Sequence, residues 1–147
     1  MIKHKLGNIL DAEENYICHQ VNCKGVMGAG LALQIKNKYP RVYADYIGRI
    51  QNDLMGRPLG EITATQVGEK QVIINMFAQD GHGRIQRYTD YEAFYKCLEK
   101  IKKITKPTST IAFPYYIGCG LGGGNWNIIE TMIKEVLYDR EVVFYHI

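Results

Sequence analysis

Two glycine-rich segments carry residue types and spacings that could bind phosphate. The first, residues 25–30, has three glycines in six positions and leads into an apolar pattern with helical spacing. The second, residues 118–124, has five glycines in seven positions and also precedes such a pattern. Glycine lets a ligand approach the backbone, and a helix N-terminus offers free N–H groups and a positive dipole. Two such loops in one small chain predict a site for two adjacent phosphates, that is, a diphosphate.

Neither segment matches the better-known nucleotide signatures. The sequence contains no Gly-x-x-x-x-Gly-Lys-Ser/Thr motif, and residues 25–30 lack the Gly-x-Gly-x-x-Gly spacing. Residues 118–123 have that spacing. The motif also requires a ribose-binding acidic residue about 20 positions further on within a βαβ unit, and the sequence that follows does not fit this requirement. For each segment taken singly, a plain tight turn is the alternative interpretation.

The hydrophobic pattern predicts alternating strands and helices that place each glycine-rich segment between a strand and a helix. In residues 90–103, for example, apolar side chains recur at the i, i+3, i+4, i+7 spacing of an amphipathic helix. We expect strands at 2–6, 16–21, 62–66, 71–77, 110–113 and 141–146, and helices at 28–39, from Pro40 onward, at 90–103 and at 125–138. This alternation predicts an α/β fold of three layers, α/β/α, with a mixed, mostly parallel central sheet flanked by helices. Ligands of such folds bind at the carboxyl ends of strands.

The bulk composition is that of an ordinary globular chain. Its 147 residues match the usual size of one domain, so we expect a single domain over residues 1–147. A net charge of +3 is too small to indicate nucleic-acid binding by itself, and the basic stretch at 100–106 is typical of a solvated helix face. No apolar run is long enough to span a membrane and no secretory leader is visible, so the expected location is cytoplasmic.

The four cysteines do not have the spacing of a metal site. Cys18 and Cys97 have apolar neighbours and are interpreted as buried free thiols, whereas Cys23 and Cys119 fall in the glycine-rich loops. A helix N-terminus after Cys119 could lower the pKa of its thiol, although no paired base is evident. We therefore expect no metal.

The two glycine loops, in this order, resemble the macrodomain family. The resemblance covers nearly the whole chain and is carried by residues 7–10, 22–30, 75–79 and 117–126. Within the family the chain is similar to the branch that contains yeast-type ADP-ribose-1''-phosphate phosphatases, terminal ADP-ribose glycohydrolases and many phage and bacterial proteins. The resemblance implies a monomer that binds ADP-ribose or ADP-ribose-1''-phosphate, requires no cofactor and has no membrane partner. ADP-ribosylated macromolecules are a further class of expected ligand.

The family also implies roles for individual positions. Asn22 would contact the hydroxyls of the distal ribose, and the second loop would wrap the diphosphate with backbone N–H groups. Asn8 stands where many macrodomains carry an aspartate that accepts the adenine amino group; an amide oxygen accepts without charge, and a plain turn residue is the alternative. The expected ligand-binding residues are Asn8, Ile9, Lys24, Gly25, Val26, Met27, Gly28, Ala29, Gly30, Gln79, Pro114, Ile117, Gly118, Cys119, Gly120, Leu121, Gly122 and Gly123.

The resemblance also bears on the reaction. The terminal glycohydrolase subgroup uses a lysine after the strand equivalent to residues 73–77 and an aspartate in the second glycine loop, and this chain has neither. The phosphatase subgroup fits better, because His19 matches a histidine at the end of the strand before the asparagine loop and could move a proton or attack phosphorus. The polar segment 79–90 offers acids, and Arg84 or Arg87 for a terminal phosphate. The expected catalytic residues are Asn22, His19, Asp90 and His82.

Structural roles are the alternatives for these residues. His19 could be a hydrogen-bonded strand residue, Asp90 could be only the N-cap of a helix, and His82 could simply be solvated. The leading function is hydrolysis of ADP-ribose-1''-phosphate or a related small ADP-ribose derivative. The alternatives are a non-catalytic ADP-ribose reader, and a hydrolase that removes ADP-ribose from protein or nucleic acid by a water-mediated route. Nucleic-acid binding as such rests only on residues 100–106.

Overall fold

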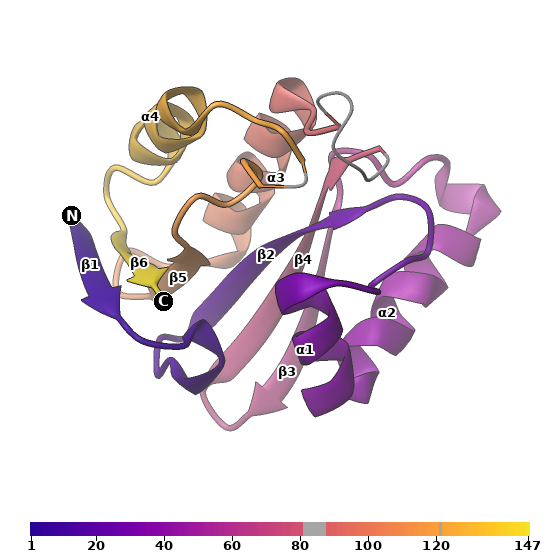
Figure 1. Ribbon diagram of the computed structural model, residues 1–147, viewed down its shortest axis with the longest axis horizontal. Helices are drawn as coiled ribbons and strands as arrows, with labels where there is room; N and C mark the ends of the chain where they lie inside the picture. The colour runs from indigo at the N-terminus through magenta and orange to yellow at the C-terminus, as the bar shows by residue number, and fades with distance from the viewer. Residues whose placement is uncertain (81–87, 121) are drawn as a thin grey trace.

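The computed structural model describes residues 1–80, 88–120 and 122–147. Its described strands form one sheet in the order β1-β6-β5-β2-β4-β3, between two layers of helices (Figure 1). The strands are β1 (Ile2–Leu6), β2 (Tyr16–Asn22), β3 (Ile62–Gly68), β4 (Gln71–Gln79), β5 (Thr110–Pro114) and β6 (Glu141–His146). The helices are α1 (Gly30–Lys38), α2 (Pro40–Gln51), α3 (Tyr91–Ile104) and α4 (Trp126–Val136), with short 3-10 turns η1 (Ile9–Asp11) and η2 (Asp53–Met55).

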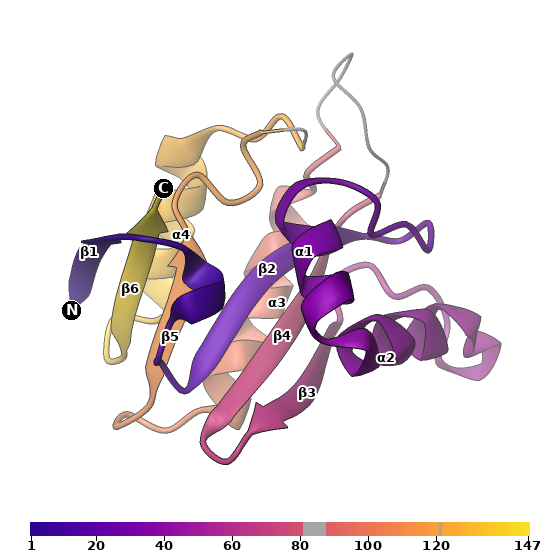
Figure 2. The same cartoon turned by 60° about the horizontal axis from the view of Figure 1, so that its bottom comes forward.

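The predicted α/β architecture is confirmed. β3 runs antiparallel to β4 and the other strand pairs are parallel, so the sheet is mixed and mostly parallel. Successive side chains of β2 enter opposite cores, Ile17 on one face and Cys18 on the other. α3 and α4 cover the face where Phe94 is buried, and α1 and α2 cover the face where Ile35 is buried (Figure 2). None of the described helices is long and apolar enough to cross a membrane.

Several predicted boundaries differ from the structure by two residues. The strands expected at 62–66 and 71–77 run on to Gly68 and Gln79, and the helix expected to end at 138 ends at Val136. The helix expected from Gly28 begins at Gly30, because residues 23–29 form an irregular loop and Ala29 has extended backbone angles. The side chain of Asn125 accepts a hydrogen bond from the Asn127 N–H and caps α4, as the sequence predicts.

The sheet opens between its two central strands. β2 and β5 pair only at Tyr16 with Ile111 and at Ile17 with Ala112. Beyond Ile17, β2 stays paired with β4 up to Asn22, while β5 stays paired with β6. Among the described residues no ladder therefore joins the carboxyl-terminal halves of β2 and β5, and the loops after both strands border this opening.

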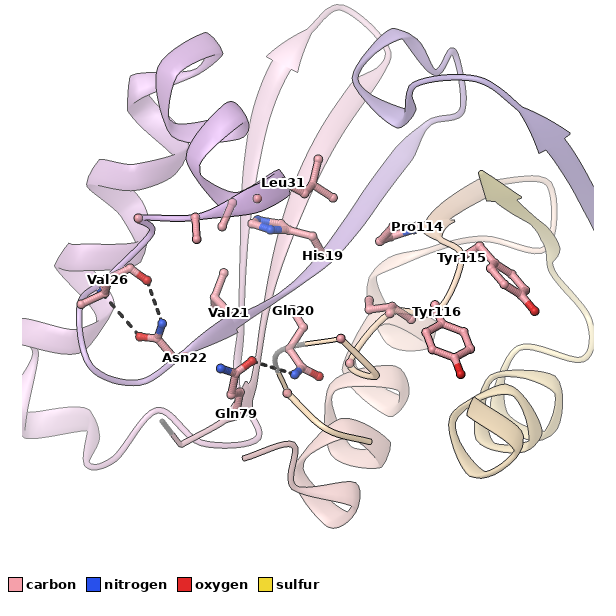
Figure 3. Close-up of a pocket in the computed structure, with 18 residues that line it drawn as sticks. His19, Gln20, Val21, Asn22, Val26, Leu31, Gln79, Pro114, Tyr115 and Tyr116 are labelled. Atoms are coloured by element: carbon pink, nitrogen blue, oxygen red, sulfur yellow. Dashed lines mark hydrogen bonds between the residues drawn. The ribbon is translucent and has the colours of Figure 1, made fainter. Parts of the chain in front are cut away.

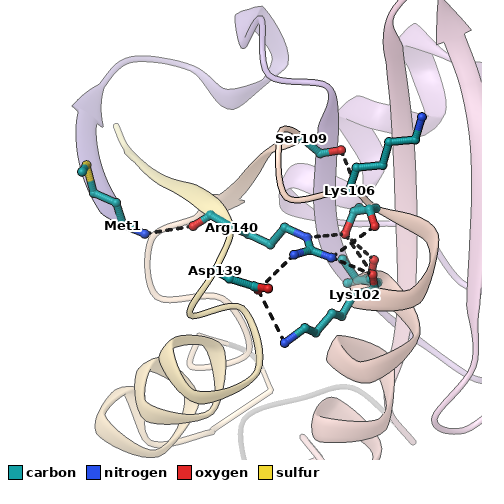
Figure 4. A network of polar contacts seen from close by, with 8 residues as sticks. Met1, Lys102, Lys106, Ser109, Asp139 and Arg140 are labelled. Atoms are coloured by element: carbon teal, nitrogen blue, oxygen red, sulfur yellow. Dashed lines mark hydrogen bonds and ion pairs between the residues drawn. The ribbon is translucent and has the colours of Figure 1, made fainter.

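At the amino end of β6, away from the opening between β2 and β5, the buried Arg140 joins this strand to the end of α3 (Figure 4). Arg140 is only 6% exposed, and its Nε donates to Thr105 Oγ1 at 3.1 Å. Its Nη2 donates to the carbonyl oxygens of Lys102 and Thr105 at 3.2 Å, and Nη1 lies 2.9 Å from Asp139. These bonds give the Thr105 carbonyl a charged donor and add one to the Lys102 carbonyl, which also accepts from Thr105 at the end of α3.

Replacing Arg140 with methionine keeps the apolar stem but removes the guanidinium hydrogen bonds to Thr105 and to the Lys102 carbonyl. We expect the free energy of unfolding, measured by urea denaturation, to fall by about 1–3 kcal/mol. The matched control, Lys134→Met on the exposed side of α4, should change it by less than about 0.5 kcal/mol. Equal losses in the two variants would contradict the structural role of Arg140.

Candidate functional site

A cleft of about 440 Å³ lies where β2 and β5 part (Figure 3). Its walls come from the carboxyl ends of β2 and β4, the N-terminus of α1 and the loop that follows β5. Both glycine-rich segments border this one cleft, as the sequence predicts. The lining residues are His19, Gln20, Val21, Asn22, Val26, Gly28, Ala29, Gly30, Leu31, Ala32, Gln79, Pro114, Tyr115, Tyr116, Ile117, Gly118, Gly120 and Gly122.

Backbone N–H groups without partners line two sides of the cleft. On one side are residues 28–32, the end of the first loop and the first turn of α1, where helix geometry leaves N–H groups without acceptors. On the other side are Gly118, Gly120 and Gly122. Within the described part of the chain, none of these N–H groups donates a hydrogen bond. Such concentrations of free donors are typical of anion sites.

The first loop, residues 23–29, is organised by a tyrosine from α2. The Tyr46 side chain is fully buried, and its Oη accepts hydrogen bonds from the N–H groups of Gly25 and Val26, both at 3.0 Å. The same oxygen lies 2.8 Å from the carbonyl oxygen and from Oδ1 of Asn22, to either of which it can donate. One hydroxyl group therefore fixes the end of β2 and the turn of the loop together.

Asn22 uses its side-chain amide to shape the same loop. Its Oδ1 accepts from the Lys24 N–H at 2.9 Å, and its Nδ2 donates to the carbonyl oxygen of Val26 at 2.8 Å (Figure 3). Asn22 lines the cleft at the predicted place, but most of its hydrogen-bonding capacity is used inside the loop. The geometry assigns it the task of positioning the loop.

His19 is a neutral, fixed hydrogen-bond acceptor at the cleft wall. Burial lowers the pKa of His19 to about 4. The ring nitrogen Nε2 lies 2.5 Å from Asn75 Oδ1, and Asn75 Nδ2 donates to Thr63 Oγ1 and to the Val42 carbonyl. Because Oδ1 can only accept, Nε2 carries the proton and Nδ1 keeps its lone pair. At neutral pH the neutral ring can accept a hydrogen bond at Nδ1.

A threonine joins the second loop to the floor of the cleft. Thr89 Oγ1 donates to the Gly118 carbonyl at 2.7 Å and accepts from Gln20 Nε2 at 2.8 Å, while the Thr89 N–H donates to the Gly122 carbonyl. A Cβ atom at Gly122 would overlap Thr89 Oγ1 and would lie 2.8 Å from the Gly118 carbonyl oxygen. Close packing of the loop on Thr89 therefore requires glycine at 122, whatever ligand the loop holds.

Aromatic side chains stand at the other end of the cleft from Asn22 (Figure 3). Tyr115 and Tyr116 are 38% and 52% exposed and both line the cleft. Tyr116 stacks on Trp126 at a ring distance of 6.0 Å and holds a φ of 70°, a strained value for a residue with a side chain. Exposed aromatic rings at this end suit a planar base.

Several predicted site residues lie outside the cleft lining. Asn8 is exposed and its Oδ1 caps η1 by accepting from the Leu10 N–H, while Ile9 and Met27 are buried in the core under α1 and α2. Asp90 accepts from the Ala93 N–H and is the N-cap of α3, the alternative considered for it. Lys24, Gly25, Cys119 and Gly123 belong to the two loops but do not line the cleft. His82, Arg84, Arg87 and Leu121 lie outside the described residues.

The cysteines offer no activated thiol, and the lowered pKa considered as a possibility for Cys119 is not found. Burial raises the pKa of Cys119 and that of Cys23 to about 11. In residues 1–80, 88–120 and 122–147, no three His, Cys, Asp or Glu side chains gather as metal ligands would.

Sequence reasoning missed the residues that support the loops. Tyr46 belongs to an apolar helical pattern, and nothing in the sequence links its hydroxyl to a loop 20 residues earlier. Gln20 and Thr89 are polar residues without a motif. Tyr115 and Tyr116 lie between β5 and the second glycine-rich segment, and this position could have indicated contact with the cleft.

Alanine substitutions in the second loop test its packing. Gly122→Ala should lower the free energy of unfolding by about 1–3 kcal/mol, because its Cβ overlaps Thr89 and the Gly118 carbonyl. At Gly120 a Cβ would meet no atom of the described residues within 4 Å, so Gly120→Ala is the control and should be near neutral. Thermal unfolding of the two variants measures the difference. A Gly122→Ala protein as stable as Gly120→Ala would be inconsistent with the described packing.

Acid titration tests the neutral state of His19. Its pKa in the folded protein, about 4, lies below the ordinary value of 6.5, so the unfolded state binds a proton first as the pH falls. Stability from this group is complete above pH 6.5 and is lost between pH 6.5 and 4. From pH 7 to 4.5 the protein should lose about 2–3 kcal/mol more than His19→Gln does, measured by urea denaturation. Equal losses would mean that His19 is not held neutral.

Comparisons with known proteins agree with the fold and the loops. The family model of the Macro domain matches residues 18–133. An uncharacterised 17.5 kDa protein of Enterobacteria phage T4 is 28% identical over 158 residues, covering 97% of this chain and 94% of its own. The DNA ADP-ribosyl glycohydrolase of Mycobacterium tuberculosis is 28% identical over 152 residues, covering 99% of this chain but only 42% of the enzyme. This chain thus spans about two fifths of that enzyme's length.

A solved structure gives the same result. The macrodomain of Thermus aquaticus DarG superposes with a TM-score of 0.79 and 26% identity, covering 100% of this chain and 99% of that one. Since the family model matches most of the sequence, including the first glycine loop, the cleft and the second loop, this chain belongs to the macrodomain family.

Proposed function

We propose that the cleft binds ADP-ribose, with the diphosphate between the two glycine loops. The observation that carries this proposal is the set of unpaired N–H groups on its two sides, residues 28–32 facing Gly118, Gly120 and Gly122. Backbone donors in such an arrangement suit a diphosphate, whose oxygens accept many hydrogen bonds. The names of the glycohydrolase relatives point to the same ligand.

The ends of the cleft suggest the orientation of the ligand. The adenine would lie toward Tyr115 and Tyr116, and the distal ribose toward Asn22 and Gln79 (Figure 3). Adenine favours contact with aromatic faces, whereas the ribose hydroxyls favour amide groups. This orientation brings the C1'' end of the ligand close to the first loop.

We further propose that the protein hydrolyses ADP-ribose-1''-phosphate or a similar small derivative. His19 would accept a hydrogen bond at Nδ1 from a ribose hydroxyl or from the attacking water, and so orient it. Asn22 and Tyr46 would hold the loop that contacts the reacting end. Gln79, the last residue of β4, lines the cleft in the region where the terminal glycohydrolase subgroup carries its lysine, so a lysine adduct at this position is not available.

A second candidate is removal of ADP-ribose from DNA by a water-mediated route. It is favoured by the DNA ADP-ribosyl glycohydrolase of Mycobacterium tuberculosis, which is 28% identical over an alignment that covers 99% of this chain. The two activities share the binding mode and differ in the group attached to the distal ribose.

Calorimetry and product assays test these proposals. ADP-ribose should bind with a micromolar dissociation constant, and ADP-ribose-1''-phosphate should release inorganic phosphate. His19→Ala should lower that rate by about 100-fold with less than about a 3-fold change in ADP-ribose affinity. Asp90→Asn keeps the helix cap and should retain full activity, whereas a catalytic acid at Asp90 predicts a large loss.

The outcomes separate the candidates. Release of ADP-ribose from modified DNA without phosphate release would favour the second candidate. Tight ADP-ribose binding without turnover of either substrate would make the protein a reader. Absence of ADP-ribose binding would overturn the whole proposal.

A further inference from the structure

A cluster of two cations and one carboxylate lies next to the Asn22 end of the cleft. Lys24 follows Asn22 by two residues, and Asp80 directly follows Gln79; Asn22 and Gln79 both line the cleft. Lys24 Nζ lies 3.9 Å from Asp80 Oδ1, and Arg57 Nη2 contacts Asp80 Oδ2. The hydrogen bond from Arg57 lowers the pKa of Asp80, so this carboxylate is ionised at neutral pH.

The cluster has an excess of positive charge. Two cations share a single carboxylate, and both are more than half exposed, Lys24 at 59% and Arg57 at 60%. At 3.9 Å the lysine ion pair is too long to be a hydrogen bond, and the arginine fork has more donors than its contact with Asp80 uses. Charge and donors are thus left for a further anion.

The segment that carries Arg57 is held in place rather than loose. Arg49 on α2 donates from Nη1 to the Gly56 carbonyl at 3.1 Å and from Nη2 to the Met55 carbonyl at 3.4 Å. After Arg57, Pro58 is buried and the Gly60 N–H donates to the Phe77 carbonyl at 2.7 Å. Arg57 is therefore presented from a fixed backbone beside the end of β4.

ADP-ribose itself gives this cluster no partner. Its charges are on the diphosphate, for which the cleft has its two sets of N–H groups, and its distal ribose is neutral. A ligand with a phosphate attached to that ribose would place an anion beyond Asn22, on the side of Lys24 and Asp80. Arginine and lysine are the side chains that recognise phosphate oxygens best.

We propose that Lys24 and Arg57, which are positioned by ion pairs with Asp80, form a subsite for a phosphate group attached to the distal ribose of the ligand. This inference rests on the proposed binding of ADP-ribose and names the substrate class at that site. The phosphate could be the monoester of ADP-ribose-1''-phosphate or a phosphodiester of ADP-ribosylated DNA. Arg57 and Lys24 would then determine specificity, while the N–H groups of the loops supply binding common to all ADP-ribose ligands.

The test compares ligands that differ only beyond the distal ribose. Displacement of a fluorescent ADP-ribose is measured by rapid mixing, before turnover, with ADP-ribose, ADP-ribose-1''-phosphate and an ADP-ribosylated oligonucleotide. At least one phosphate-bearing ligand should bind about 10-fold more tightly than ADP-ribose. Lys24→Gln and Arg57→Gln should each remove most of this preference and leave ADP-ribose affinity within about 2-fold. Lys134→Gln on α4, an equally exposed and ion-paired lysine, is the control and should change nothing.

Asp80→Asn distinguishes a phosphate subsite from a purely structural ion pair. An asparagine can still accept from Arg57 but carries no charge, so affinity for the phosphate-bearing ligand should rise by about 2–5-fold. A structural tie predicts that Asp80→Asn and Arg57→Gln weaken all three ligands alike. If Lys24→Gln and Arg57→Gln weaken binding of the ADP-ribosylated oligonucleotide and make its affinity less dependent on salt, the subsite binds DNA. If they weaken binding of ADP-ribose-1''-phosphate alone, the subsite binds that small monoester.

The phosphate subsite and the proposed binding of ADP-ribose fail on different results. If the three ligands bind equally and the cation variants change nothing, the subsite is wrong while ADP-ribose binding stands. If fluorescent ADP-ribose does not bind at all, the proposed function is wrong.

Discussion

The parting of β2 from β5 is the constraint on which the rest of the structure depends. In a fully paired parallel sheet a hydrogen-bond ladder would close the space between these strands. The loops could then form a binding site only at the carboxyl edge of the sheet. Here the pairing stops at Ile17, and the next five residues of β2 are held from one side only, by β4. His19, Gln20 and Asn22 thereby become walls of a cleft and not the interior of a sheet.

Different contacts fix the two glycine loops beside this opening. The first is held by bonds to a single buried hydroxyl, that of Tyr46, and by the amide of Asn22. The second is held by close packing on Thr89, which excludes a side chain at Gly122. These supports use Tyr46, Asn22 and Thr89, whereas the N–H groups that stay unpaired within the described part of the chain belong to residues 28–32, Gly118, Gly120 and Gly122. Rigidity and binding capacity therefore come from different residues. Loops fixed in this way lose little conformational freedom when an anion binds.

The sequence predicted the fold and the position of the cleft because both have local signatures. Helical spacing around Phe94 and the strand-to-helix setting of the glycine loops are readable within short windows. The supports were not readable, because they join residues that are distant in sequence. The hydroxyl of Tyr46 lies in an apolar helical pattern, and Arg57 lies in a segment with no motif. Asn8 and Met27 were expected at the ligand from the family resemblance, yet one caps η1 and the other is buried in the core. Asp90 shows the same limit, since a cap and a catalytic acid have the same sequence pattern.

We propose that backbone amides on both sides of the cleft bind one diphosphate. Amide chemical shifts can be followed by NMR as ADP-ribose is added. The largest shifts should occur at Gly28, Gly30, Gly118, Gly120 and Gly122, with Gly48 and Gly68 unmoved as internal references. Shifts confined to one loop, or spread over glycines remote from the cleft, would contradict this proposal.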